Sequence, residues 1–261
     1  MTEEEAGQHW NQNAAAWTVL TRAGYDVYRD HLNTPAFLAA LPPVHGLTGL
    51  DIGCGEGNNT RLVAQRGARM HAVDISEIFI ENAREYEARH PTGIAYQVAS
   101  ATKLPFPDAC FDFATSFMCL MDIPDAGLAI REAFRVVKPG GFFQFSITHP
   151  CFDTPHRKNL RAETGLTYAI EVGDYYKNLN GRIVQEWIFG AAPDHLKAAY
   201  QKFKVPLFNQ TLTQWFEAIR AAGFVLEHLY EPYPSDDVVR RYPSLQDAQV
   251  VGYFLHFRCR K

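Results

Sequence analysis

Several features that mark other classes of protein are missing from this chain of 261 residues. The 25 basic and 29 acidic side chains give a net charge of −4, without the basic excess that nucleic-acid binders carry. No apolar run approaches the ~18 residues that a membrane span needs. The acidic start, residues 1–5, is not followed by the apolar stretch of a signal peptide. We therefore expect no nucleic-acid partner and no membrane span.

The cysteines and histidines lack the spacings of disulfide and metal sites. The five cysteines form no C-x-x-C pair, and an odd, scattered set predicts free thiols in a reducing cytoplasm. The ten histidines form neither an H-x-x-x-H nor an H-E-x-x-H pattern, so we expect no metal site. Apolar residues make up 47% of the chain, which is ordinary for a globular protein with a core.

What the chain does contain is a strand pattern, then three alternating glycines, then a helical stretch. Residues 47–52 predict a buried strand, and Gly53, Gly55 and Gly57 follow it. Glycine lets the backbone take positive φ and lets a ligand lie against bare main chain. The pattern D-x-G-x-G-x-G begins at Asp51 and differs from the G-x-G-x-x-G fingerprint of dinucleotide binding. An acid here disfavours a pyrophosphate and suits a cation, such as the ammonium of an amino acid.

A second acid ends the next predicted strand. Residues 69–75 predict this strand, and Ser76 then predicts the start of a helix that runs to about residue 88. An acid at the tip of the second strand, here Asp74, can accept hydrogen bonds from both hydroxyls of a ribose. A role for Asp74 as a second helix cap stays open.

The rest of the chain continues the alternation that is typical of an α/β fold. Residues 1–41 predict helices, and residues 232–247 predict a long loop. Asp125 and Thr211 are typical helix-capping residues that predict two further helices. Further strands are predicted at residues 94–98, 111–117, 142–147, 225–230 and 249–258.

Taken together, these motifs resemble the class I S-adenosylmethionine-dependent methyltransferases, in the small-molecule branch that is quinone-biosynthesis-like (methyltransferase type 11). The glycine loop and Asp74 are followed, in the family's order, by A-x-x-L-P-F at residues 101–106 and R-V-x-K-P-G-G at residues 135–141. The resemblance covers residues 45–150 well and residues 211–261 loosely. It implies an α/β, Rossmann-like, seven-stranded and mostly parallel sheet with an antiparallel last strand. It also implies helices on both faces and an insertion after the fifth strand.

The same resemblance implies S-adenosyl-L-methionine as the cofactor and S-adenosyl-L-homocysteine as the product. The family usually has aspartate at the position of Ser100, where it receives the exocyclic amine of adenine. Serine accepts a hydrogen bond without the charge, and the Ala101 N–H can serve the adenine ring nitrogen. The expected cofactor-binding residues are Asp51, Gly53, Cys54, Gly55, Gly57, Asn58, Asp74, Ile75, Ser100, Ala101, Thr102, Phe117 and Met118.

We expect four segments: an N-terminal helical cover (1–44), the cofactor-binding core (45–150), an inserted lid or acceptor subdomain (151–210) and the C-terminal completion of the sheet (211–261). The N-G pair at residues 180–181 predicts a turn of an added hairpin formed by apolar segments such as 183–184 and 187–189. A rigid satellite with its own small core is the alternative to a lid. Aromatic contacts to the acceptor are expected from Tyr25, Tyr28, Tyr175, Tyr176 and Trp187, with plain core packing as the alternative for the N-terminal pair.

The implied reaction is an in-line displacement in which a small-molecule acceptor attacks the methyl group on the sulfonium. His149, directly after the fifth strand, and Asp122, after the fourth, are the candidate bases, although either can have a structural role. Three alternatives stay open: an RNA or protein methyltransferase on the same fold, a nicotinamide dehydrogenase, and a non-catalytic cofactor-binding protein. We expect a monomer or a homodimer.

Overall fold

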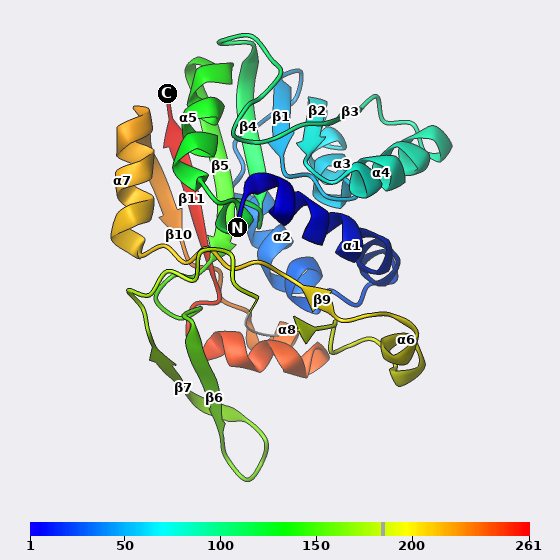
Figure 1. Cartoon of the computed structure of the whole chain (residues 1–261), viewed down its shortest axis with the longest axis vertical. Helices are drawn as coiled ribbons and strands as arrows, with labels where there is room; N and C mark the ends of the chain where they lie inside the picture. The colour runs from blue at the N-terminus through cyan, green and yellow to red at the C-terminus, as the bar shows by residue number, and fades with distance from the viewer. Residues whose placement is uncertain (184–185) are drawn as a thin grey trace.

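A seven-stranded sheet forms the centre of the computed structural model, which describes residues 1–183 and 186–261 (Figure 1). The strand order is β10-β11-β5-β4-β1-β2-β3. Only β11 runs antiparallel, to both β5 and β10. This confirms the mostly parallel, Rossmann-like sheet with an antiparallel last strand. The strands are β1 (Thr48–Ile52), β2 (Arg69–Asp74), β3 (Ala95–Val98), β4 (Phe111–Phe117), β5 (Val137–Thr148), β10 (Val225–Tyr230) and β11 (Phe254–Arg260).

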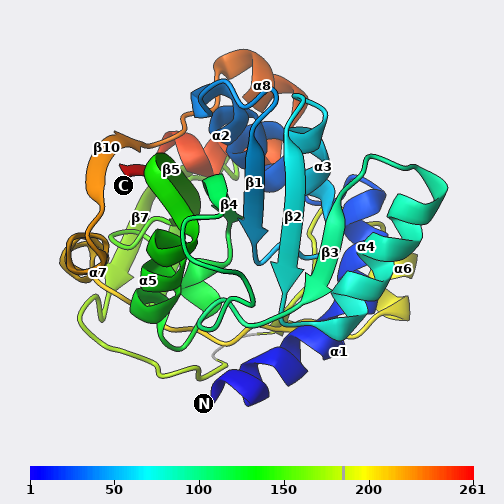
Figure 2. The same ribbon diagram turned by 90° about the horizontal axis from the view of Figure 1, so that it is seen from above.

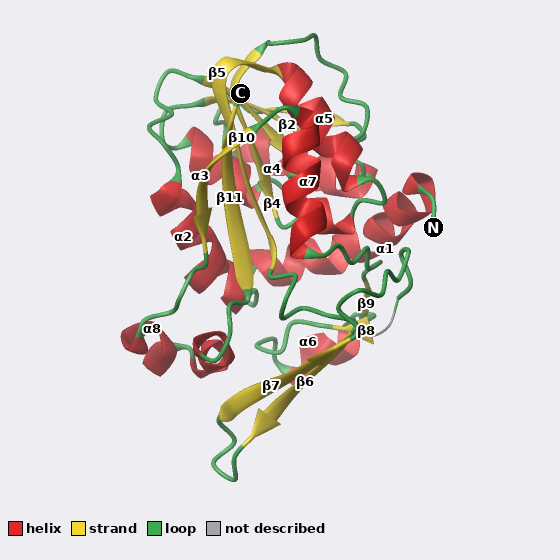
Figure 3. Ribbon diagram, turned by 90° about the vertical axis from the view of Figure 1, so that its left-hand side faces the viewer, coloured by secondary structure: helices red, strands yellow, loops and turns green. Residues whose placement is uncertain are grey.

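Helices cover both faces of this sheet, as Figure 3 shows for α2 and α3 on one side and α5 and α7 on the other. The cluster of buried side chains on the first face includes Phe37, Val63 and Ile80, and the cluster on the second includes Ile130 and Trp215. Because both faces are covered, the central strands β4 and β5 are buried along most of their length rather than at alternate residues. The helices are α2 (Thr34–Ala40), α3 (Asn58–Ala64), α4 (Glu77–Arg89), α5 (Ala126–Val136) and α7 (Leu212–Ala222).

Three helices begin where the sequence predicts. In each, the side chain of the residue just before the helix accepts the backbone N–H of the residue three positions further on. Ser76 caps α4, Asp125 caps α5, and Thr211 forms a capping box with Gln214 at the start of α7. The same mechanism starts α1 (Glu3–Arg22), which Thr2 caps. A short π-helix (Arg29–Asn33) then leads into α2.

The N-terminal helix α1 lies across the carboxyl edge of the sheet, beside α4 (Figures 1 and 2). The Trp10 ring packs on Phe79 of α4, with the two centroids 6.2 Å apart. Asn82 of α4 donates to the Thr18 hydroxyl at 3.1 Å. Helix α1 is therefore joined to the sheet's carboxyl edge through side chains as well as through the chain itself.

The insertion after β5 splits into two parts that dock on different elements. The hairpin of β6 (His156–Arg161) and β7 (Thr167–Gly173) is tied to the C-terminal segment by Asp247, which accepts from the Thr167 hydroxyl and from Arg161. The second part contains β8 (Glu186–Trp187), α6 (Asp194–Ala199) and β9 (Phe203–Lys204), and its aromatic rings pack on Trp17 of α1. Among the described residues, the buried cluster of this second part includes Leu20 of α1, so the insertion does not build a core of its own.

The predicted hairpin within residues 183–189 is wrong. Asn180 and Gly181 do take positive φ, 49° and 82°, so the turn forms. The segments after the turn pair elsewhere, however, because Trp187 lies opposite Phe203 and Arg182 bridges to Leu207. Val184 of that prediction lies outside the described residues. The hairpin β6–β7 was not predicted.

Three boundaries also differ from the prediction. Strand β5 begins at Val137, before the proline and paired glycines. Val137 already pairs with Phe111 of β4, and the next pair is Phe142 with Phe113. The residues between Val137 and Phe142 therefore form a bulge in the strand. The predicted long loop at 232–247 contains α8 (Asp236–Arg241), capped by Ser235, and the start of a 3₁₀ helix (Pro243–Gln249). This helix delays β11 to Phe254.

Candidate active site

The candidate site lies at the carboxyl ends of β1, β2, β3 and β4, where ligands sit in open α/β sheets. Four loops meet there: the glycine loop after β1, residues 75–76 after β2, residues 99–102 after β3, and residues 118–122 after β4. The predicted cofactor residues lie in these four loops or in the strand and helix ends that adjoin them. Helix α1 covers the edge that they form (Figure 2).

All three loop glycines have positive φ, but the space around them differs. A Cβ on Gly53 would lie 2.0 Å from the Cys119 sulfur, and one on Gly57 would lie 2.4 Å from the Tyr96 hydroxyl. These two positions are therefore required by the packing of the chain itself. A Cβ on Gly55, where φ is 55°, would meet no atom within 4 Å. The loop thus presents bare backbone to open space at Gly55, and this fits a ligand lying against it.

Asp51 lies beneath this loop with both carboxylate oxygens engaged. It is 1% exposed, and it accepts from the Thr60 hydroxyl at 2.5 Å and from the Thr115 hydroxyl at 3.0 Å. Burial raises the pKa of Asp51 to about 6. These bonds fix the start of α3 against β4, so the carboxylate supports the loop from below.

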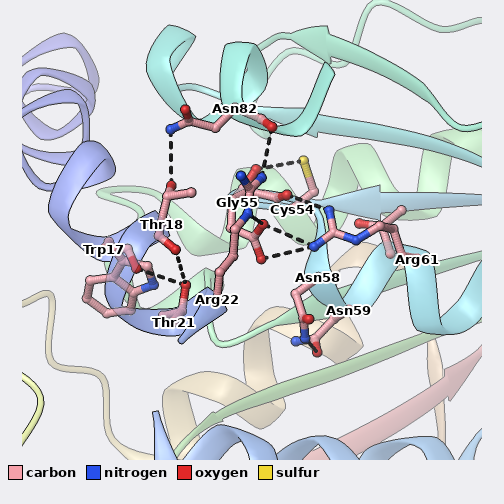
Figure 4. Close-up of polar contacts among 12 residues, drawn as sticks. Trp17, Thr18, Thr21, Arg22, Cys54, Gly55, Asn58, Asn59, Arg61 and Asn82 are labelled. Carbon is pink, nitrogen blue, oxygen red and sulfur yellow. Dashed lines mark hydrogen bonds and ion pairs between the residues drawn. The ribbon is translucent and has the colours of Figure 1, made fainter. Parts of the chain in front are cut away.

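Two neighbours of the loop glycines are held locally. The Cys54 thiol contacts the Gly55 carbonyl at 3.5 Å, and burial raises its pKa well above the ordinary value, so it stays protonated. The Asn58 amide donates to Asn59 at 3.2 Å, and Asn59 also accepts from Thr34 at the start of α2. Both predicted cofactor residues therefore adjoin the open loop (Figure 4).

Asp74 joins the second loop to the first. Its Oδ2 accepts the Gly55 N–H at 2.8 Å, and its Oδ1 accepts the Ser76 N–H at 2.9 Å. Burial raises the pKa of Asp74 to about 6, although these N–H donors oppose the shift. Because an ionised carboxylate has about four lone-pair sites, each oxygen can accept one further hydrogen bond.

The loop after β3 meets a carboxylate that the sequence does not predict. Glu3 of α1 accepts from the Ser100 hydroxyl and, at 2.8 Å, from the Thr102 hydroxyl. Among the described residues, the N–H of Ala101 has no hydrogen-bond partner. No local signal identifies Glu3, because it is one of three acids in the first turn of α1 and 97 residues separate it from Ser100.

Helix α1 touches the site at two more points along its length. Asn11 accepts from the Ser76 hydroxyl at 2.7 Å. Gly7 lies against Ile75, and a Cβ on this glycine would come within 3.2 Å of the isoleucine side chain. The residue after Asp74 is thus covered by α1.

The last turn of α1 is held by a buried acid of the glycine loop. Arg22 pairs with Glu56 at 2.8 Å. It also donates to the Asn82 carbonyl at 2.8 Å (Figure 4). Glu56 is 4% exposed and is also neutralised by Arg61 at 3.0 Å. Because this carboxylate is paired with two guanidinium groups, its charge holds α1 and α3 to the loop.

Phe117 and Met118, at the end of β4, have different environments. The Phe117 side chain is buried and lies 3.9 Å from the Phe37 ring, centroid to centroid, so it belongs to the core beneath α2. Met118 has a φ of 51°, a conformation that costs a non-glycine residue about 1–3 kcal/mol. Its N–H donates to the Ser146 carbonyl at 3.0 Å, and this bond holds the strained backbone at the site.

His149 has both ring nitrogens engaged. Its Nδ1 accepts the Cys151 N–H at 3.2 Å, so its Nε2 carries the proton and donates to Glu231 at 2.7 Å. The residue is 5% exposed, and burial lowers the pKa of His149 while Glu231 opposes that shift. In this arrangement neither nitrogen is free to take a proton from a bound molecule.

Asp122 contrasts with His149. It is 8% exposed, and among the described residues its carboxyl has no hydrogen-bond partner. Burial, reinforced by the nearby charge of Asp153, raises the pKa of Asp122 well above its ordinary value. Asp153 lines a small cavity of about 30 Å³ together with Met121, Thr148, Pro150, Leu207, Phe208, Asn209, Gln210 and Trp215.

The five aromatic residues expected at an acceptor site do not gather at one place. Tyr176 is 88% exposed, and Tyr175 accepts the Leu212 N–H at the start of α7. Trp187 packs edge-on to Trp17, and Tyr25 joins the same cluster. Tyr28 stacks on Tyr253. None of the five lines the small cavity or the larger one of about 480 Å³ between the start of α1 and residues 179–182.

Within residues 1–183 and 186–261, no group of three or more His, Cys, Asp or Glu side chains is arranged to hold a metal ion. In the same residues, no helix combines the length and the apolar character needed to cross a membrane.

Comparison with known proteins agrees with this geometry. A family model described as a methyltransferase domain matches residues 50–145. The chain is 29% identical to malonyl-[acyl-carrier protein] O-methyltransferase of Salmonella typhimurium, over 73% of this chain and 69% of that relative. It is 36% identical to 27-O-demethylrifamycin SV methyltransferase of Amycolatopsis mediterranei, over only 41% of each chain.

A solved structure extends the likeness to most of the fold. The S-adenosylmethionine-dependent methyltransferase of Mesorhizobium loti matches with a TM-score of 0.69 and 29% identity, over 87% of this chain and 96% of that one. The motifs, the sheet and these relatives together support one assignment, to the class I S-adenosylmethionine-dependent methyltransferases and their small-molecule branch.

Proposed function

We propose that this protein transfers the methyl group of S-adenosylmethionine to an oxygen atom of a small-molecule acceptor. The observation that carries the proposal is the Asp74 carboxylate, which accepts the Gly55 N–H beside the open face of the glycine loop. The choice of oxygen rests on relatives that are named for methylation at oxygen.

The cofactor supplies a methyl group that is already activated on a sulfonium. The chain's own part is to bind and orient. We assign the amino-acid end to the backbone around Gly55, the ribose to Asp74 and the adenine to residues 100–102. Orientation of this kind is worth roughly 7–11 kcal/mol of the barrier. Helix α1 excludes water from the bound cofactor, because it covers the loops after β1, β2 and β3.

For proton removal, we propose Asp122 rather than His149. Support comes from the Asp122 carboxyl, which has no hydrogen-bond partner among the described residues. Burial and the nearby charge of Asp153 raise its pKa, and a carboxylate of higher pKa is a stronger base. His149 instead positions the segment after β5, since its two nitrogens are occupied by Cys151 and Glu231. If the acceptor loses its proton only after methyl transfer, no base is required.

We further propose that the acceptor enters at the small cavity beside Asp153. Its volume of about 30 Å³ holds about one water molecule, so the insertion has to move to admit an acceptor. The Asn209 amide oxygen, in the wall of this cavity, is buried without a hydrogen-bond partner among the described atoms. An acceptor with a hydroxyl donor beside an apolar body satisfies this oxygen and packs on Trp215.

The division of the chain follows from these assignments. We propose residues 45–150 with 211–261 as the cofactor-binding core, residues 1–44 as its cover, and residues 151–210 as the acceptor-side insertion. All five cysteines are free, which is consistent with our proposal of a reducing cytoplasm. We propose action as a monomer or homodimer without a nucleic-acid partner.

The test combines binding with turnover. Calorimetry with S-adenosylmethionine and S-adenosylhomocysteine should give dissociation constants in the micromolar range, about −8 kcal/mol. Transfer of a labelled methyl group should then be measured with hydroxylated aromatic compounds, malonyl thioesters and free fatty acids. If neither S-adenosylmethionine nor S-adenosylhomocysteine binds, the proposal is overturned. Binding without transfer to any oxygen acceptor would leave a cofactor-binding protein.

A further inference from the structure

The position where the family resemblance expects an aspartate for the adenine amine carries Ser100, which has no charge. The structure nevertheless brings a carboxylate to this position from helix α1, 97 residues earlier in the chain. Glu3, in the first turn of α1, bonds to the hydroxyls of both Ser100 and Thr102. The chain thus has an anion at the adenine loop, although the loop itself contains none.

The hydrogen bonds fix the direction of this carboxylate. The Ser100 hydroxyl accepts the Thr102 N–H at 3.0 Å and lies 2.8 Å from the Thr102 hydroxyl. Because an ionised carboxylate can only accept, the Ser100 hydroxyl donates its proton to Glu3. Thr102 donates to the second carboxylate oxygen at 2.8 Å. Each oxygen of Glu3 therefore receives one hydroxyl and keeps a further lone pair. Ala101 lies between these two residues in the sequence, and its N–H has no partner among the described residues.

We propose that Glu3 supplies the anionic acceptor for the exocyclic amine of adenine, so that the N-terminal helix α1 determines cofactor specificity. The inference rests on the proposed function, since it requires adenine to lie at residues 100–102. An amine bound to a carboxylate makes a charge-assisted hydrogen bond, about twice as strong as a neutral one. The Ala101 N–H donates to the neighbouring ring nitrogen.

Helix α1 does not depend on Glu3 for its placement. Arg22 pairs with the buried Glu56 at its far end, and Asn11 accepts from Ser76 at its middle. The capping box of Thr2 and Glu5 starts the helix without Glu3. Removing the Glu3 carboxylate should therefore leave the helix docked, and this separates recognition of adenine from folding of the cover.

The experiment compares two ligands on three proteins by calorimetry. The ligands are S-adenosylhomocysteine and its 6-deamino analogue, in which purine replaces adenine and only the amine is lost. The proteins are the wild type, Glu3→Ala and the control Glu4→Ala. Glu4 has the same charge, lies in the same turn and is exposed without a side-chain partner in the described structure.

We expect the wild type to prefer the adenine ligand by roughly 10- to 100-fold, the range of a hydrogen bond to a charged group. In Glu3→Ala this preference should fall to about threefold or less, because affinity for the deamino analogue changes little. Glu4→Ala should keep the preference of the wild type. Glu3→Gln, which keeps an acceptor oxygen without the charge, should give an intermediate preference.

Two results would overturn the inference. One is an equal loss of affinity for both ligands in Glu3→Ala, which indicates that the residue only holds the helix. The other is an unchanged preference, which places the amine elsewhere. Thermal melting of each variant shows whether it is folded. If the wild type binds neither ligand, the proposed cofactor site itself fails, and this outcome is distinct from both of the others.

Discussion

The carboxylate of Asp74 accepts the backbone N–H of Gly55 at 2.8 Å, so the tip of β2 holds the middle of the glycine loop in place. The bond joins the two motifs that the sequence separates by a helix and a strand. It also sets the direction of the remaining lone pairs of Asp74, to which we assign the ribose in our proposal.

The first prediction concerns the pH dependence of cofactor binding. Burial raises the pKa of Asp74 from 3.8 to about 6, so protonation begins to remove the charged acceptor as the pH falls through 6. Affinity for S-adenosylhomocysteine should therefore rise from pH 5 to about pH 7 and then level off. Asp74→Asn should weaken binding by roughly 1.5–3 kcal/mol at pH 8. Calorimetry across this range checks both, with Glu77→Gln, an exposed neighbour, as control. An identical pH profile for wild type and Asp74→Asn would contradict the ribose assignment.

The second prediction separates the glycines of the loop. Gly55→Val should abolish cofactor binding and leave a folded protein, because its side chain meets open space where the ligand lies. Backbone strain at this φ costs about 1–2 kcal/mol. Gly93→Val has a similar strain at a φ of 82° and no neighbour within 4 Å, and it should bind normally. Gly53→Ala should instead unfold more easily, since its Cβ meets Cys119. Circular dichroism and calorimetry distinguish the three, and wild-type affinity in Gly55→Val would exclude the loop as the site.

The third prediction concerns Asp122. If its carboxyl accepts the acceptor's proton, Asp122→Asn should lower single-turnover methyl transfer by about 10²–10⁴ and leave cofactor affinity nearly unchanged. The wild-type rate should rise with pH through one ionisation above the ordinary carboxyl range, because Asp122 has to lose its proton. Asp153→Asn removes the neighbouring negative charge and should move this ionisation to lower pH. A pH profile that Asp153→Asn leaves in place would count against Asp122 as the base.

The thermal stability of Asp122→Asn gives a second measurement on the same residue. The substitution should lower turnover but raise stability. A carboxyl whose folded-state pKa is raised destabilises the folded protein as the pH rises above its unfolded value. Asp122→Asn should therefore melt at a higher temperature than the wild type at pH 8, and the difference should shrink toward pH 4. A destabilised variant at pH 8 would indicate that Asp122 has a structural partner.

The last prediction concerns His149. Because Cys151 and Glu231 occupy its ring nitrogens, His149→Ala should lose stability by about 1–3 kcal/mol and keep turnover within about threefold per folded molecule. Glu231→Gln should keep most of the stability, since Glu231 is more than half exposed. His156→Ala, at an exposed His–Glu pair, serves as control. Loss of turnover by 10² or more in His149→Ala, at unchanged cofactor affinity, would restore it as the candidate base.

The sequence by itself determined the elements whose hydrogen bonds close within a few residues. Ser76, Asp125 and Thr211 each accept a backbone N–H three residues ahead, so their helices start where the residue type indicates. The strand, glycine loop and helix at residues 48–64 likewise follow from apolar pattern and from the freedom of glycine. The resemblance to a family, carried by the order of the motifs, then predicted the mostly parallel sheet with its antiparallel last strand.

Only the tertiary structure decided which side chains from distant segments meet. Phe117 turns toward Phe37 in the core, although its position at the end of β4 places its backbone at the site. The insertion packs on Trp17 of α1 rather than on itself, because its short strands cannot bury their aromatic rings alone. Glu3 reaches Ser100 across 97 residues of sequence. No spacing encodes that contact, since it depends on the angle at which α1 crosses the sheet, and this angle is set by the packing of whole elements.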